Sequence, residues 1–366
     1  MTNPDVELDT PSLLIDLDVL ERNVASMAEV AAKAGVRLRP HTKTHRSTAI
    51  ARMQLEAGSA GITVAKLGEA EVMVHAGIDD VLVAYPIVGE TKRTRLRALL
   101  ERARVRTTLD SVEVAEGLAK TGLDLGRDVE VLVEVDTGQH RLGRPPGAPT
   151  VDLVREVARI DGVEIVGLLT HAGHAYRSAS PEELRTAAER EGLDLVETAE
   201  LCRKDGIELR EISVGSTPTA RIVAGVAGVT EIRPGTYVFN DVQQMRLGVA
   251  TEATCAARIH ATVVSRVDDR FVLDAGTKAF SSDGADGPPF PGRGVVVGRP
   301  ELRIDFMTEE HAVGHLTGAA ELRIGDSLEV VPLHVCSAVN MFDAATTMRG
   351  GQVVGEIAID ARGRSR

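Results

Sequence analysis

The sequence has no tryptophan and few other aromatic residues, with three tyrosines and six phenylalanines among 366 residues. Proteins that bind single-stranded nucleic acid stack bases on aromatic side chains, so this shortage argues against that class. Acidic residues outnumber basic ones, 54 to 42, which gives a formal net charge of −12. Because phosphate backbones attract clustered Lys and Arg, this balance argues against a general nucleic-acid-binding function.

Cysteines and long apolar runs are also scarce. Cys202, Cys255 and Cys336 form no disulfide framework, which is typical of a protein in a reducing cytoplasm. No run of about 18 apolar residues is present, so we expect no membrane span. The polar residues 1–9 lack the apolar stretch of a secretion signal, and we predict a cytoplasmic protein with no membrane partner.

Lysine is rare, whereas arginine is common. Only seven of the 42 basic residues are lysines, and codon bias explains such a skew without a functional cause. The shortage still narrows the search for a catalytic amine. The seven lysines are Lys33, Lys43, Lys66, Lys92, Lys120, Lys204 and Lys278.

Residues 36–240 alternate short β-rich runs with helical patterns. Several runs, such as VLVA and VEVLVEV, are nearly all apolar, as in parallel strands that are covered on both sides. Eight such units in succession predict an α/β fold with a TIM-like (β/α)8 barrel. An open doubly wound sheet would show a glycine-rich fingerprint after its first strand, where this chain has HTKTH. The predicted strands are residues 36–40, 61–65, 81–84, 106–109, 129–135, 164–169, 211–214 and 230–233.

The segments between these strands carry apolar residues at helical spacing. We predict that the helix beginning at Leu67 ends at Gly77, because glycine is favoured just after a helix. Ser111 and Thr150 are predicted as the N-terminal caps of two later helices.

The pattern changes near residue 240. From Ala256 onward, short runs such as ARIHATVVSRV, RFVLDAG, SLEVVPLHV and QVVGEIAID are separated by Gly and Asp, which predicts a mainly antiparallel β domain. We assign residues 16–240 to the barrel and residues 241–366, together with 1–15 and their strand at 12–15, to the β domain. Residues 281–293 are rich in Gly, Pro and Asp and are predicted to form a loop.

Polar residues follow most of the predicted barrel strands. Because the active site of such a barrel lies where the carboxyl ends of its strands meet, these residues are candidates, although every barrel rim is polar to some degree. They are His41, Lys43, His45, Lys66, Tyr85, Asp110, Asp136, His140, Arg141, His171, His174, Tyr176, Ser216, Thr217, Gly235, Thr236 and Tyr237.

Two of these loops have the composition of an anion site. GSTPT at 215–219 and PGTY at 234–237 offer backbone N–H groups and hydroxyls after strands seven and eight, where such barrels bind phosphate. Two ordinary turns are the alternative. Lys43 follows the first strand, and a lysine in a partly desolvated barrel mouth attacks carbonyls. A lysine and a phosphate site together indicate pyridoxal phosphate, unless Lys43 is an ordinary surface lysine.

The second domain carries one further pattern, LHVCSAVN at 333–340. His334 and Cys336 are two residues apart, so in an extended segment both side chains point to one face and can share a metal ion. An imidazole and a thiolate together favour zinc. A buried cysteine beside a hydrogen-bonded histidine is the other interpretation. Cys202 and Cys255 have no histidine at ligand spacing and are predicted to be structural.

Together these motifs resemble those of the fold-type III pyridoxal-phosphate enzymes, and within them the group of D-serine dehydratases and D-threonine aldolases. The resemblance extends from DTPSLLIDLD at 9–18 to the C-terminal segment. Its strongest pieces are RPHTKTH, VEVDTGQHRLG, HAGHAY, VGSTPT, RPGTYVFNDVQQ, LDAGTKAFSSDG and LHVCSAVN. It implies a barrel like that of alanine racemase.

The resemblance also implies a role for each site residue. Lys43 would hold pyridoxal 5'-phosphate covalently, Arg141 would face the phenolic oxygen of the cofactor, and Tyr176 would approach its pyridine nitrogen. His334 and Cys336 would bind a divalent metal, with zinc first and manganese or magnesium as alternatives. The residues implied to hold the phosphate are Ser216, Thr217, Gly235 and Thr236.

The implied reaction is that of a lyase on D-amino acids with a β-hydroxyl, such as D-serine, D-threonine or 3-hydroxyaspartate. His-x-Cys and NDVQQ resemble the dehydratases, whereas the aldolases carry His-x-Asp. We therefore predict β-elimination of water to a 2-keto acid and ammonia. Retro-aldol cleavage to glycine and an aldehyde is the alternative.

Two other functions remain open. A metal-dependent hydrolase on the same barrel would use histidines of HTKTH and HAGH as ligands, and a non-catalytic pyridoxal-phosphate carrier would need the barrel alone. Fold-type III enzymes resemble one another in forming head-to-tail dimers, so we expect a homodimer on that analogy.

Overall fold

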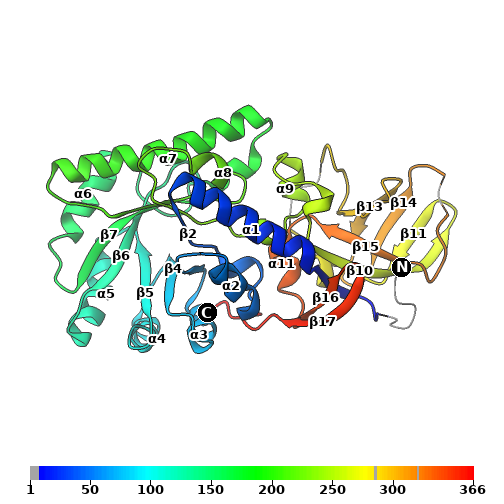
Figure 1. Ribbon diagram of the computed structural model, residues 1–366, viewed down its shortest axis with the longest axis horizontal. Helices are drawn as coiled ribbons and strands as arrows, with labels where there is room; N and C mark the ends of the chain where they lie inside the picture. The colour runs from blue at the N-terminus through cyan, green and yellow to red at the C-terminus, as the bar shows by residue number, and fades with distance from the viewer. Residues whose placement is uncertain (1–7, 284–286, 320) are drawn as a thin grey trace. The chain divides into compact units, whose positions relative to one another are not determined.

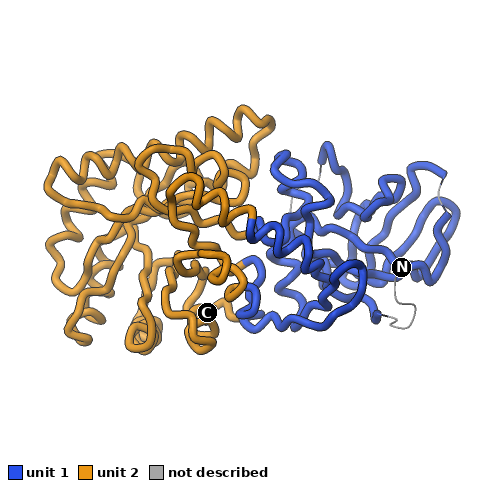
Figure 2. The backbone as a smooth tube through the Cα atoms, viewed as in Figure 1, with its two compact units in different colours: residues 1–25, 44–50, 236–363 blue, residues 26–43, 51–235, 364–366 orange. Residues whose placement is uncertain are grey.

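The computed structural model describes residues 8–283, 287–319 and 321–366. Most of the segment 1–9, for which the sequence predicted no secretion signal, therefore lies outside the described residues. Contacts divide the chain into two compact units, each assembled from separate segments (Figure 2). Unit 1 comprises residues 1–25, 44–50 and 236–363, and unit 2 comprises residues 26–43, 51–235 and 364–366. The sequence predicted simpler boundaries, with a barrel at 16–240 and a β domain at 241–366 together with 1–15. The units differ from these ranges in short segments, such as residues 44–50, which belong to unit 1 although they lie between strands of the barrel.

Unit 2 is built on eight parallel strands, which are β2 (Arg37–Leu38), β3 (Ile62–Val64), β4 (Asp80–Pro86), β5 (Arg104–Leu109), β6 (Val129–Glu134), β7 (Val163–Leu169), β8 (Glu211–Val214) and β9 (Glu231–Ile232). They follow the order β2-β9-β8-β7-β6-β5-β4-β3. The amides of Ala60 and Thr63 donate to the carbonyls of Leu38 and Pro40, which joins β3 to β2 and closes the barrel. The predicted TIM-like barrel is confirmed, with all eight strands where they were expected.

Helices alternate with these strands, and α3 to α7 lie around the outside of the sheet (Figure 1). Gly77 follows α3 with a φ of +88°, the left-handed conformation expected after a helix. Ser111 is the N-cap of α5, as predicted. Thr150 is not a cap, because α6 begins earlier, after Gly147, with a proline in its first turn. The helices are α1 (Leu17–Ala34), α2 (Thr48–Glu56), α3 (Leu67–His75), α4 (Glu90–Leu100), α5 (Val112–Leu125), α6 (Ala148–Val157), α7 (Pro181–Lys204) and α8 (Ala220–Val223).

Unit 1 contains the predicted β domain, a nine-stranded sheet formed by β1 (Ser12–Asp16), β10 (Ala257–Val267), β11 (Arg270–Leu273), β12 (Gly294–Val296), β13 (Leu302–Met307), β14 (Ala312–Leu316), β15 (Ser327–Pro332), β16 (Ala344–Arg349) and β17 (Gln352–Ala358). All strand pairs are antiparallel except β1 with β16. Pairing of β10 with β11 closes part of the sheet into a ring. Three short helices, α9 (Val242–Arg246), α10 (Thr277–Phe280) and α11 (Val335–Val339), complete the unit.

The sequence did not indicate β13, β14 or β16 as separate strands. Their sequences, LRIDFM, AVGHL and AATTMR, mix polar and small residues with apolar ones, so their strand pattern is weak. Within the segment 281–293 that was predicted to be a loop, residues 284–286 lie outside the described residues, and β12 begins just after it.

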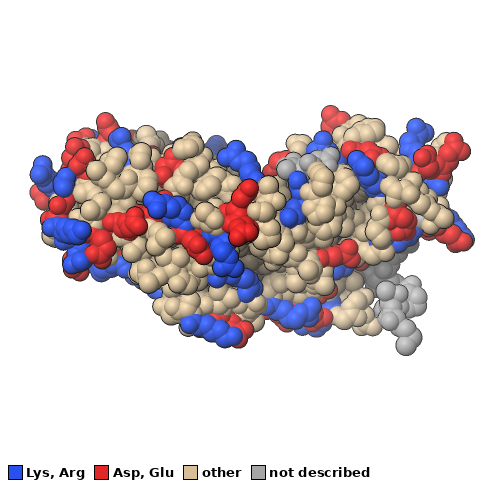
Figure 3. Space-filling model, turned by 90° about the horizontal axis from the view of Figure 1, so that it is seen from above, with Lys and Arg blue, Asp and Glu red and all other residues tan. Residues whose placement is uncertain are grey.

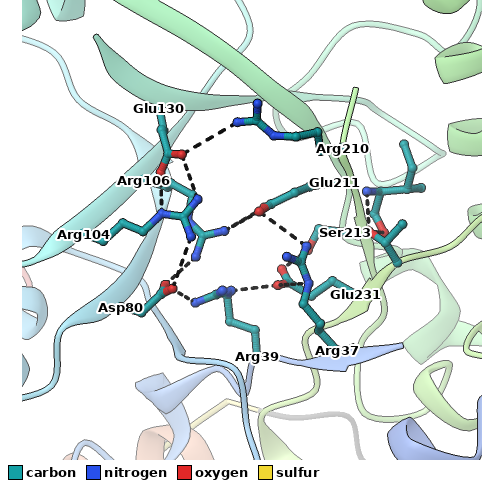
Figure 4. A network of polar contacts seen from close by, with 12 residues as sticks. Arg37, Arg39, Asp80, Arg104, Arg106, Glu130, Arg210, Glu211, Ser213 and Glu231 are labelled. Carbon is teal, nitrogen blue, oxygen red and sulfur yellow. Dashed lines mark hydrogen bonds and ion pairs between the residues drawn. The ribbon is translucent and has the colours of Figure 1, made fainter. Parts of the chain in front are cut away.

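The starts of the barrel strands carry a network of buried charges (Figure 4). Arg106 donates to both carboxylate oxygens of Glu211, at 2.6 and 2.8 Å, and also to Asp80. Arg39 donates to Glu231 at 2.9 Å and to Asp80 at 2.6 Å. Burial opposes ionisation of Glu231, but the guanidinium of Arg39 and the hydroxyl of Ser213 hold the pKa of Glu231 below its ordinary value. This end of a TIM barrel serves stability rather than catalysis.

Replacing Arg106 by glutamine is expected to lower the free energy of unfolding by about 3–5 kcal/mol, because the buried carboxylate of Glu211 loses the guanidinium that donates to both of its oxygens. The side chain of Arg106 is fully buried. Arg104, two residues earlier on the same strand, is half exposed and pairs with Glu130, so Arg104→Gln is the matched control and should cost no more than about 1 kcal/mol. Urea unfolding measures both values. Equal losses in the two variants would contradict a structural role for the buried network.

The surface carries charges of both signs. On the face drawn in Figure 3, Lys and Arg side chains are interspersed with Asp and Glu side chains and do not gather in one basic patch. Among the helices of the described residues, none has the length and apolar composition needed to cross a bilayer.

Candidate active site

The candidate residues of unit 2 follow the carboxyl ends of barrel strands. Lys43 lies in a short 3-10 helix, η1 (Thr42–Thr44), after β2, and Arg141 lies in the loop after β6. Tyr176 lies in η2 (Gly173–Arg177) after β7, and Ser216 follows β8. Parallel strands point the same way around a barrel, so these residues occupy the same end of it, opposite the network of Figure 4.

Several positive groups meet at this end of the barrel. Burial and the nearby side chains of Lys43, Arg233, His171 and Arg141 lower the pKa of His41 well below its ordinary value. Burial and the same three cationic side chains also lower the pKa of His171. The three cationic side chains give this region a positive potential, which favours an anionic ligand.

Arg233 was not among the candidates, although it ends the last predicted strand. Its side chain is buried, its Nε donates to the Ser213 hydroxyl at 2.8 Å, and another of its guanidinium nitrogens donates to the Thr170 carbonyl. Burial lowers the pKa of Arg233, against the opposing effect of Glu231, Glu134 and Glu191. The available signal was its place at the carboxyl end of the last predicted strand, because active sites of such barrels lie at that end.

Lowering the pH from 7.5 to 5 is expected to destabilise the protein partly through His41. The unfolded chain protonates this histidine near pH 6.5, whereas the folded protein resists because the pKa of His41 is lowered. The stabilising contribution is therefore complete above about pH 6.5 and is lost below it, by up to about 1.4 kcal/mol per pH unit. Urea unfolding of wild type and His41→Asn at several pH values tests this, and parallel pH profiles would refute it.

The loop after β8 only partly matches the predicted anion cradle. Gly215 turns the chain with a φ of +94°, and its amide donates to the buried carboxylate of Glu191 at 2.9 Å. The amide of Ser216 donates to the Thr219 hydroxyl at 2.9 Å. The amides of Gly215 and Ser216 are therefore engaged within the protein, and the hydroxyl of Ser216 lies 3.1 Å from that of Thr219.

Glu191 was missed by the sequence reasoning because it lies within the long helix α7. Its Oε1 accepts from the amides of Gly215 and Ala172, which ties together the loops after β7 and β8. Burial raises the pKa of Glu191. This carboxyl group therefore fixes the loop that carries Ser216.

In unit 1, His334 and Cys336 lie together, but not on a strand as predicted. Strand β15 ends at Pro332, His334 is the N-cap of α11, and Cys336 belongs to that helix. Burial lowers the pKa of His334, but the nearby side chains of Cys336 and Asp283 raise it more. The pair therefore meets because the chain turns into a helix, and not through the two-residue alternation of a strand.

Three neighbouring groups fix this pair. Asp283 Oδ2 lies 2.6 Å from Nδ1 of His334, and the hydroxyl of Thr44 lies 3.2 Å from Sγ of Cys336. Asp241, the N-cap of α9, accepts from the amide of Val335 at 3.0 Å. None of these groups was singled out from the sequence. All three nevertheless lie within motifs of the family resemblance: Thr44 in RPHTKTH, Asp241 in RPGTYVFNDVQQ and Asp283 in LDAGTKAFSSDG.

Thr236 and Gly235 follow β9. The hydroxyl of Thr236 lies 3.7 Å from Sγ of Cys336, and its carbonyl accepts the amides of Phe239 and Asn240 in and after η3 (Thr236–Val238). A residue that was predicted to bind phosphate thus contacts a predicted metal ligand.

The remaining cysteines are buried. Burial raises the pKa of Cys202 to about 11 and also raises the pKa of Cys255, so both thiols are unreactive near neutral pH. Within the described part of the chain, no group of three or more His, Cys, Asp and Glu side chains has the arrangement of a metal site.

Two protein families match the chain in succession. Residues 15–242 match the alanine racemase N-terminal domain, and residues 256–348 match a domain described as a putative serine dehydratase domain. The chain is 36% identical to the D-threo-3-hydroxyaspartate dehydratase of a Delftia species, over 92% of this chain and 93% of that protein. This chain belongs to the alanine racemase-like family, in its group of dehydratases and aldolases. The family expected from the motifs is confirmed.

Other members of this alanine racemase-like group span both reactions. A D-threonine aldolase of an Arthrobacter species is 32% identical over 100% of this chain and 95% of its own length. The crystal structure of D-threonine aldolase from Filomicrobium marinum superposes with a TM-score of 0.92 at 33% identity, covering 98% of this chain and 96% of that one. A D-threo-3-hydroxyaspartate dehydratase has also been solved in a metal-free form as a cysteine-to-alanine variant, with a TM-score of 0.88 at 34% identity, covering 96% of this chain and 97% of that one. Dehydratases and aldolases are lyases, which leaves the hydrolase alternative without support.

Proposed function

We propose that this protein is a pyridoxal 5'-phosphate-dependent, metal-assisted lyase that eliminates water from D-amino acids with a β-hydroxyl, giving a 2-keto acid and ammonia. The observation that carries the proposal is the group of positive side chains around Lys43 at the carboxyl ends of the barrel strands. The names of the relatives support the same class of substrate.

The residues around Lys43 fit the cofactor. Arg141 and Arg233 supply positive charge near a lysine, as an anionic phosphate and phenolate require. Ser216 and Thr217 add hydroxyls after β8, where such barrels bind phosphate. Pyridoxal phosphate, when bound, spreads the negative charge that develops at the substrate Cα.

The His334–Cys336 pair fits a divalent metal. A nitrogen and a sulfur ligand together favour zinc over harder cations. A metal-free relative in which a cysteine is replaced by alanine supports a cysteine ligand in this group. The metal supplies Lewis acidity, which helps a poor leaving group such as hydroxide to depart.

The chain itself supplies the proton transfers. The amine of Lys43 would take the Cα proton of the substrate as a general base. His41 and His171 stay neutral because their pKa values are lowered. Neither imidazole therefore adds a positive charge that would oppose protonation of the Lys43 amine. Loss of the Cα proton and of the β-hydroxyl forms water, and hydrolysis of the resulting enamine releases the keto acid and ammonia.

Product analysis tests this proposal directly. The enzyme is incubated with D-serine, D-threonine and D-threo-3-hydroxyaspartate, with and without a chelator, and with the L-isomers as controls. We expect a keto acid and ammonia from at least one D-substrate, and a loss of activity with the chelator. Absence of both keto acid and amino-acid cleavage products from all substrates would reject the proposal.

Aldol cleavage is the second candidate function, favoured by the TM-score of 0.92 with a D-threonine aldolase. It would use the same residues but break the Cα–Cβ bond, with the proton leaving from the β-hydroxyl. Glycine and acetaldehyde from D-threonine would identify this reaction. The cysteine at position 336 supports elimination, because the sequence resembles the dehydratases there.

We further propose that the protein acts as a homodimer on small molecules alone, without nucleic acid or membrane partners, and in the cytoplasm. The group to which it belongs and its acidic composition support this assignment. Light scattering of the purified protein is expected to give twice the mass of one chain, and a monomeric mass at enzyme-assay concentration would contradict it.

A further inference from the structure

Asp283 makes three hydrogen bonds around the helix start that carries Cys336. Its Oδ2 lies 2.6 Å from Nδ1 of His334 and accepts from the hydroxyl of Ser337 at 2.8 Å. Its other oxygen accepts from the hydroxyl of Ser281. His334 and Ser337 lie on either side of Cys336 in the sequence, so one carboxylate fixes both flanks of that cysteine.

We infer that Asp283 is a positioning residue that presents His334 to the metal. A carboxylate at Nδ1 keeps the proton on that nitrogen and leaves the lone pair on Nε2, the only other ligand atom of the ring. Histidine ligands commonly donate their second ring nitrogen to a carboxylate, which fixes the ring and makes it a stronger ligand. The inference rests on the proposed function, since it assumes a metal at His334 and Cys336.

The geometry assigns Asp283 this role and not that of a third ligand. Its Oδ2 is already shared between His334 and Ser337, and it lies on the Nδ1 side of the ring. Ser281 holds the remaining oxygen. The carboxylate therefore acts through the imidazole.

The same unit offers a matched control. On the paired strands β13 and β14, Asp305 Oδ2 lies 2.5 Å from Nδ1 of His315. The two pairs have similar exposure, 29% and 44% for His334 and Asp283 against 36% and 32% for His315 and Asp305. Asp305→Ala thus breaks an equivalent pair and reveals any general loss of folding.

The experiment measures the affinity of the full-length enzyme for zinc. Chelator-treated wild type, Asp283→Ala, Asp283→Asn and Asp305→Ala are titrated with Zn²⁺ against a competing chelator. Binding of Co²⁺ is followed in parallel through the thiolate-to-cobalt absorption band. We expect Asp283→Ala to bind zinc about 10- to 100-fold more weakly, the usual cost of losing an outer partner of a metal ligand. Asp283→Asn keeps an acceptor oxygen and should lie between, and Asp305→Ala should match wild type.

The outcomes separate this inference from the proposed function. If wild type binds no zinc or cobalt, both the metal site and the role of Asp283 are rejected. If wild type binds zinc and Asp283→Ala binds it equally well, only the role of Asp283 is rejected. Equal weakening by Asp305→Ala would also overturn it, because the effect would then come from the fold of the unit. Thermal unfolding of the metal-free variants shows whether each protein is folded.

Discussion

Replacing Lys43 by alanine is expected to lower turnover of the best D-amino acid substrate by about 10²- to 10⁴-fold, the range for losing a general base. The loss of covalent cofactor attachment adds to this effect. Absorbance of the purified variant should show no band from a lysine-bound cofactor, and steady-state kinetics give the loss of turnover.

Lys66→Ala is the matched control for this substitution. Lys66 also follows a barrel strand, but its ammonium lies 3.2 Å from the centre of the Tyr85 ring, an interaction that occupies it in a cation–π contact. We expect the control to keep its cofactor and most of its turnover. If Lys66→Ala lost the cofactor and Lys43→Ala kept it, the assignment of the amine would be wrong.

Replacing Cys336 by alanine is expected to remove the metal and to lower turnover by more than about 100-fold, since losing even an outer partner of a ligand costs up to that much in affinity or activity. His334 alone would remain as a ligand. Metal analysis of the purified protein and rates at saturating zinc measure the two effects. The cofactor absorbance should persist, which separates this variant from Lys43→Ala.

Cys202→Ala is the control for the loss of a thiol. Cys202 is buried in α7 and its pKa is raised by burial, so its substitution should leave metal content unchanged. Full turnover of Cys336→Ala, with no metal bound, would show that the reaction needs neither the thiol nor the metal at this position.

The sequence predicted the barrel well because its strands are short apolar runs, such as VLVA in β4 and VEVLVE in β6. Both faces of these strands are covered, so apolar composition and strand position coincide. In the β domain, β13 and β14 mix polar and small residues with apolar ones. They pair with each other, but their place in the sheet also depends on the pairing of β14 with β11, more than 35 residues earlier, which local sequence does not encode.

The motifs suggested individual site residues, but they assigned no role to the groups that support those residues. The spacing of His334 and Cys336 suggested a strand, whereas the chain turns into α11. Asp283 lies in a glycine-rich stretch with no periodic pattern, and only the fold brings it to His334. Glu191 reaches the β8 loop from within a helix. Such contacts depend on tertiary structure and leave no trace in local sequence.

The most direct test of the account is to locate the cofactor on the chain. The purified enzyme is reduced with borohydride and digested, and the peptides are analysed by mass spectrometry. We predict a phosphopyridoxyl group on the peptide that contains Lys43, and none on the peptides of the other six lysines. An unmodified Lys43 in an enzyme that is active and fully loaded with cofactor would contradict the account.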